Sequence, residues 1–189
     1  MTDRMAALSH FLYRFSRGWV VLLGFIVFIG FSTLTLPGQN AIVDEYSQGS
    51  GSPDTSLFYN AKQLYHMAEV YGQEGRTAYL NARWTFDVAF PFIYTFFLVS
   101  AIGWLLNQSL PVGSRWRLIN LVPLAALGLD FLENTATSVV MARYPHHCSL
   151  AEWLAPVFTL LKWLLVGGSL VVLLAAIFLV LLRRIKKNA

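Results

Sequence analysis

Four apolar stretches dominate the pattern of the chain, and each is long enough to form a helix that crosses a membrane. The hydrocarbon core of a bilayer is about 30 Å thick, so a spanning helix needs roughly 20 residues. The stretches cover residues 19–36, 82–106, 118–142 and 153–182. We therefore predict an all-α integral membrane protein, a four-transmembrane-helix bundle that forms a single domain over residues 1–189.

A long polar segment, residues 37–81, separates the first two stretches. Residues 38–53 are rich in Gly and Ser, which neither pack nor restrict the backbone, so we expect an exposed flexible loop there. Apolar residues then recur at helical spacing between about residues 55 and 71. This pattern predicts an amphipathic helix that starts after Asp54 and lies on the outer membrane surface or caps the bundle.

The composition agrees with a membrane protein. The chain is 56% hydrophobic and 13% charged, about half the charged share of an ordinary soluble domain. So few charges cannot coat a soluble globule, which argues against a disordered chain, a nucleic-acid-binding module and a conventional soluble enzyme. We expect no nucleic-acid partner.

Metal and cofactor chemistry has little support in the sequence. The single cysteine, Cys148, excludes an intramolecular disulfide, and its neighbours His146 and His147 fit one tetrahedral metal ion poorly because the three are adjacent. The chain has no P-loop, dinucleotide-binding, serine-hydrolase or zinc-protease motif. We therefore expect no resident metal and no cofactor.

The basic residues indicate an orientation, because Lys and Arg in short flanks tend to stay in the cytoplasm. With four spans, three basic groups fall on one side of the membrane, and both termini are then cytoplasmic. Basic inner flanks and one cysteine fit a multi-pass protein of a cell membrane, such as the bacterial inner membrane. The three groups contain Arg4, Arg14, Arg17, Arg115, Arg117, Arg183, Arg184, Lys186 and Lys187.

Charged residues inside the apolar stretches are the most informative feature. An ionised group that faces lipid costs at least about 2.5 kcal/mol, so such groups are expected to face inward or to pair. Pro91 cannot donate to the carbonyl of Asp87, which leaves a free acceptor beside that carboxylate. A polar edge at helical spacing leads into the second stretch and contains Arg76, Tyr79, Arg83, Asp87, Pro91 and Tyr94.

The third and fourth stretches supply further polar groups. Asp130, Glu133 and Asn134 share one helix face, and two acids cannot both stay ionised in a low-dielectric interior without compensation. Lys162 on the fourth stretch is the natural compensating cation. A rise of about 1.5 Å per residue places Glu133 and Lys162 at the same depth, roughly 14 Å from the outer ends of their helices. We therefore predict a buried Glu133–Lys162 pair, with Asp130 and Asn134 nearby and Asp87 above.

Three functions from different classes remain open. The first is a binding or transport protein in which these residues hold a small cation, a proton or a lipid headgroup. The second is an intramembrane enzyme that acts on a lipid or isoprenoid, with Glu133 or Asp87 as general acid or base. The third is an accessory or assembly subunit whose buried polar groups only hold helices together, at about 0.6 kcal/mol per hydrogen bond.

We expect membrane lipid as a partner, and the small residues 167–169 favour close contact with a second copy or a partner subunit. No residue is assigned as catalytic. The candidate ligand-binding residues are Asp87, Asp130, Glu133, Asn134, Lys162, Arg83, Arg76 and Tyr94.

Overall fold

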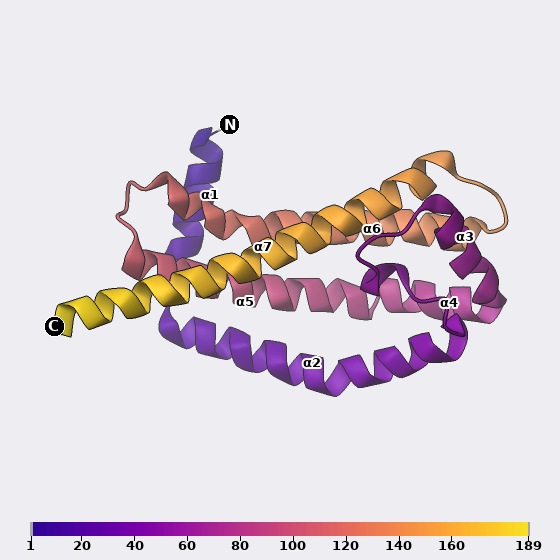
Figure 1. Cartoon of the computed structure of the whole chain (residues 1–189), viewed down its shortest axis with the longest axis horizontal. Helices are drawn as coiled ribbons and strands as arrows, with labels where there is room; N and C mark the ends of the chain where they lie inside the picture. The colour runs from indigo at the N-terminus through magenta and orange to yellow at the C-terminus, as the bar shows by residue number, and fades with distance from the viewer. Residues whose placement is uncertain (1, 189) are drawn as a thin grey trace. The chain divides into compact units, whose positions relative to one another are not determined.

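The chain is almost entirely helical in the computed structural model, which describes the backbone of residues 2–188 and the side chains of residues 4–186. Within that range there is no β-strand (Figure 1). The elements, in order, are α1 (Thr2–Phe15), α2 (Gly18–Ser47), the 3-10 helix η1 (Pro53–Thr55), α3 (Ala61–Val70), α4 (Gly72–Arg83), α5 (Phe86–Ser109), the 3-10 helix η2 (Arg115–Leu121), α6 (Val122–Arg143) and α7 (Ser149–Asn188).

Three helical segments among the described residues are long and apolar enough to cross a membrane. They are α2, the consecutive helices α4 and α5, and α7. The expected all-helical chain, with helices long and apolar enough to span a membrane, is therefore confirmed in this coarser form. The fourth span, expected at residues 118–142, is not among the three; α6 fills this region with 22 residues and carries Asp130 and Glu133.

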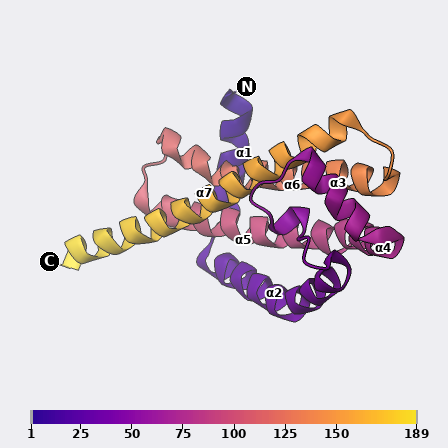
Figure 2. The ribbon, with the colours of Figure 1, turned by 45° about the vertical axis from the view of Figure 1, so that its right-hand side comes forward.

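The end of α2 differs from the prediction. The helix continues past Leu36 and through Pro37 to Ser47, so the flexible loop expected from residue 38 is wrong for its first part. A proline removes one backbone donor but leaves the donors after it intact, so a helix can continue beyond it. The chain turns only at residues 48–51, where Gln48 and two glycines have positive φ (Figure 2).

The helix expected at residues 55–71 is shorter than predicted. It starts at Ala61, because Asn60 and Gln63 each bond the other's backbone N–H in a capping box. Gly72, with φ of +61°, separates α3 from α4. Leu64 on α3 is buried, whereas Lys62 is exposed.

The chain forms two compact units. The first unit contains Met1–Ile29, Ile93–Ala125 and Leu164–Ala189, and the second contains Gly30–Phe92 and Ala126–Trp163. Nine of the 14 Lys and Arg but one of the 10 Asp and Glu belong to the first unit, a formal charge of +8. The second unit contains the remaining five Lys and Arg and nine Asp and Glu, which gives it a formal charge of −4. Most acidic residues therefore belong to the second unit, where the candidate site lies.

The second unit has a core of aromatic and aliphatic side chains. This core joins α3 and α4 to α6 and the start of α7. Burial of such side chains is the main stabilising contribution available to the unit. Its most deeply buried members include Tyr59, Leu64, Ala68, Tyr79, Val140, Met141 and Ala155.

Candidate functional site

An arginine at the end of α4 lies between two carboxylates. The guanidinium of Arg83 forms ion pairs with Asp54 of η1 and with Asp87 of α5, one helical turn further along the chain. The ring of Tyr79 lies 4.8 Å from the guanidinium carbon, close enough for a cation–π contact. Arg83 is only 6% exposed, so its charge is balanced by these partners and not by water. We call Asp54, Arg83 and Asp87 the arginine triplet.

A lysine on α7 lies between two further carboxylates. The ammonium of Lys162 pairs with Glu133, and its nitrogen is 3.9 Å from a carboxylate oxygen of Asp130. Glu133 is fully buried, and Lys162 is 6% exposed. The predicted Glu133–Lys162 pair is therefore present, because both helices bring these residues to the same depth. We call Asp130, Glu133 and Lys162 the lysine triplet, and the two triplets together the ion cluster.

Asn134, which is fully buried, connects the two triplets. Its amide nitrogen donates to the backbone carbonyl of Asp87 at 3.2 Å, and its oxygen accepts from Arg83 at 3.5 Å. The Asp87 carbonyl is the acceptor that Pro91 leaves without a helical donor. The sequence thus revealed an unpaired acceptor, and the structure shows that a side chain of α6 pairs with it.

A chain of hydroxyl groups leads to the buried carboxylate of the lysine triplet. The Tyr59 hydroxyl is 2.9 Å from Thr159 Oγ1, and that oxygen is 2.8 Å from Glu133 Oε1. Burial raises the pKa of Tyr59 above its ordinary value, so this phenol keeps its proton. A threonine hydroxyl has one proton to donate and can also accept a hydrogen bond. If Thr159 accepts from Tyr59, its own proton is available for the hydrogen bond to Glu133.

The segment around η1 covers the arginine triplet. The backbone carbonyl of Asp54 accepts from the Trp163 indole at 3.1 Å, and the Ser52 hydroxyl lies 3.1 Å from the Asp54 carboxylate. Sequence reasoning took Asp54 for a helix cap and did not predict its contact with Arg83. It also missed Tyr59. Both residues lie outside the α-helices, where the 3.6-residue spacing does not predict which way a side chain points.

Two predicted site residues are not found with the ion cluster. Arg76 donates to the carbonyl of Ala68 at 2.8 Å, and its guanidinium carbon lies 4.6 Å from the ring of Tyr144. Tyr144 also lines an open surface pocket formed by α3 and the turn after α6. Tyr94 is buried on α5 and belongs to the first unit, whereas the other predicted site residues belong to the second.

The charges within the ion cluster do not balance. Four carboxylates face two cations, which gives a formal charge of −2 when all six groups are ionised. Excess negative charge in a low-dielectric interior is costly, and bound protons or a bound cation relieve it.

Comparison of the chain with known protein families, with curated proteins and with solved structures gives no match.

Proposed function

We propose that the ion cluster takes up protons or a small cation inside the membrane, in a multi-pass protein. The observation that supports this proposal is the excess of two carboxylates over the cations that face them. Both cations of the cluster already lie between acids, so the site favours a positively charged ligand over an anionic lipid phosphate. Hard cations such as Na⁺ or Ca²⁺ prefer carboxylate and carbonyl oxygens.

A four-span arrangement is part of this proposal, with α6 as the additional span. A helix of 22 residues is about 33 Å long, which is enough to cross the hydrocarbon core. Asp130 and Glu133 lower its hydropathy, but their pairing with Lys162 means that neither has to face lipid. In this arrangement both termini are cytoplasmic, and α3 lies at the outer surface.

The Tyr59–Thr159–Glu133 chain provides a route for protons in this proposal. The hydroxyl groups of Tyr59, which precedes α3, and of Thr159 would form the last two links of this route to Glu133. Polar chains of this kind are typical of intramembrane proton relays.

Infrared spectroscopy of the full chain in lipid nanodiscs tests the uptake of protons. A protonated carboxyl group has a carbonyl-stretch band, and we expect a band that appears on acidification and is lost in Glu133→Gln. Asp87→Asn should remove a second component. The matched control is Glu69→Gln, because Glu69 is exposed on α3. Identical titrations in the wild type and in both buried variants, with no effect of Na⁺, K⁺ or Ca²⁺, would overturn the proposal.

Proteoliposomes that contain a pH-sensitive dye distinguish binding from transfer. With a K⁺ gradient and valinomycin, a transporter should change the internal pH faster than protein-free vesicles do, and Glu133→Gln should abolish the difference. Titratable carboxyl bands without flux support a binding site alone. The absence of both results contradicts binding and transport and favours an accessory subunit in which buried charges hold helices together.

A further inference from the structure

The N-terminal helix α1 is attached to the first unit by one polar face. The Ser9 hydroxyl donates to Asn120 Oδ1 at 2.8 Å, and the Tyr13 hydroxyl donates to the carbonyl of Arg117 at 2.9 Å. The guanidinium of Arg117 also lies 4.0 Å from the centre of the Tyr13 ring. Ser9 and Tyr13 are buried, so this face holds α1 against η2.

The end of α1 is fixed by close packing against α5. A Cβ atom added to Gly103 would lie only 2.4 Å from Ser16 Oγ, so a larger residue at this position would push the chain away. Within the first unit, α1 runs across the direction of α5 and not along it (Figures 1 and 2). If α5 spans the membrane, a helix that crosses it in this way lies along the membrane plane.

The remaining surface of α1 has an apolar row. Met5, Leu8, Phe11 and Phe15 follow one another at spacings of three or four residues and are 46%, 45%, 55% and 58% exposed. The rings of Phe11 and Phe15 contact each other, with centroids 4.8 Å apart. Exposure of four neighbouring large apolar side chains is typical of a surface that meets a membrane or a partner.

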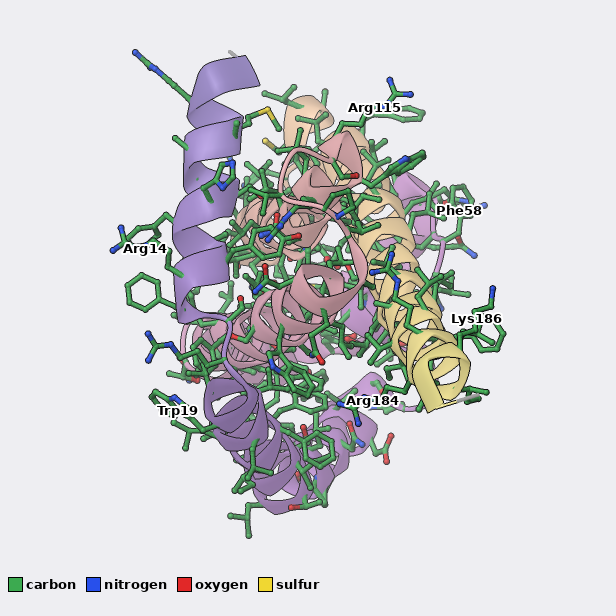
Figure 3. All side chains as sticks on the ribbon, turned by 90° about the vertical axis from the view of Figure 1, so that its left-hand side faces the viewer. Arg14, Trp19, Phe58, Arg115, Arg184 and Lys186 are labelled. Carbon is green, nitrogen blue, oxygen red and sulfur yellow. The ribbon has the colours of Figure 1, made fainter. Side chains whose placement is uncertain are left out.

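Basic residues lie next to this apolar row. His10 and Arg14 are exposed and lie four residues apart, which places them on a second side of the helix, and the exposed Arg17 follows two residues after the helix ends. Figure 3 shows Arg14 extending away from the ribbon of α1. The rest of the first unit adds further exposed cations, namely Arg115, Arg183, Arg184 and Lys186.

We propose that α1 is a membrane-surface helix that binds acidic phospholipids. Its apolar row enters the boundary between headgroups and acyl chains, and its arginines contact lipid phosphates. The formal charge of +8 on the first unit complements an anionic leaflet, and this favours lipid over an apolar protein partner. The assignment rests on α5 spanning the membrane and is independent of any ligand at the ion cluster.

Lipid retention by the full chain tests this assignment. The protein is purified from nanodiscs of phosphatidylcholine and phosphatidylglycerol in a 3:1 ratio, and its bound lipids are counted by native mass spectrometry. We expect the wild type to be enriched in phosphatidylglycerol, and Arg14→Gln/Arg17→Gln to reduce the enrichment at least threefold. The matched control is Lys62→Gln/Arg143→Gln, which removes two exposed cations from the second unit.

A fluorescent label on α1 tests its depth in the membrane. Cys148→Ser removes the only cysteine, and Ala7→Cys then places a label on an exposed position of α1. Lipids brominated near the headgroup should quench this label in Cys148→Ser/Ala7→Cys, and adding Phe11→Ser/Phe15→Ser should remove the quenching without unfolding the chain. The same loss of phosphatidylglycerol in both double charge variants, or a label protected only when two copies associate, would overturn the assignment.

Discussion

Replacing Lys162 with methionine removes the cation of the lysine triplet while keeping a side chain of similar length. Removing one partner of a buried ion pair typically costs about 3–5 kcal/mol, because the other charge is left without compensation. Glu133 is fully buried, and its carboxylate oxygen Oε1 retains only the hydroxyl of Thr159 as a neutral donor. We expect a loss of about 3 kcal/mol in the free energy of unfolding at neutral pH, since protonation of an acid relieves part of the cost. For a chain of this length, that corresponds to a fall of roughly 6–12 °C in Tm.

Thermal unfolding of the full chain in nanodiscs, followed by circular dichroism, measures this effect. The double variant Glu133→Gln/Lys162→Met should recover most of the lost stability, because it removes the uncompensated carboxylate together with the lysine. Lys62→Met, at an exposed position, should leave Tm unchanged. The reasoning is refuted if Lys162→Met unfolds at the wild-type temperature, or if the two substitutions in the double variant are simply additive.

Three further predictions concern other contacts. Asn134→Ala should lower the free energy of unfolding by about 1–3 kcal/mol, because the Asp87 carbonyl loses its donor. The double variant Asn134→Ala/Pro91→Ala should regain part of this free energy, because alanine at position 91 supplies a backbone N–H to the same carbonyl. Chemical denaturation measures both effects. Burial raises the pKa of Tyr59, so its neutral form stabilises the folded chain fully below about pH 10. This stabilisation is lost as the pH rises further, and Tyr59→Phe should therefore flatten the alkaline part of a Tm–pH profile. Gly103→Val should detach α1, which increased hydrogen exchange in residues 4–15 would report, whereas unchanged exchange would contradict the close packing.

Helical periodicity explains how much of the site was predictable. The positions of residues on a helix face and their depth along it follow from fixed geometry, so spacing alone grouped Asp130 with Glu133 and placed Lys162 opposite them. The same geometry failed for Arg76, because its long side chain donates to the carbonyl of Ala68 and lies over the ring of Tyr144. Residues on one helix face therefore need not share a site when a long side chain reaches other partners.

Contacts made by segments outside the α-helices were not predictable. Asp54 reaches Arg83 from η1, and Tyr59 reaches Thr159 from the stretch before α3, although each is far from its partner in sequence. Helix α1 was missed for another reason. The face that holds it is polar, with Ser9 at its centre, so its apolar residues do not mark the buried side.

The contact between Asn134 and the Asp87 carbonyl has a consequence for evolution. Pro91 creates the vacancy that this amide occupies, so a lineage that replaces the proline by a residue with a backbone N–H loses one reason to keep the asparagine. If the asparagine is lost first, the buried Asp87 carbonyl has no donor, and selection acts against the resulting loss of stability. We therefore expect the two positions to change together among related sequences, with the proline lost first.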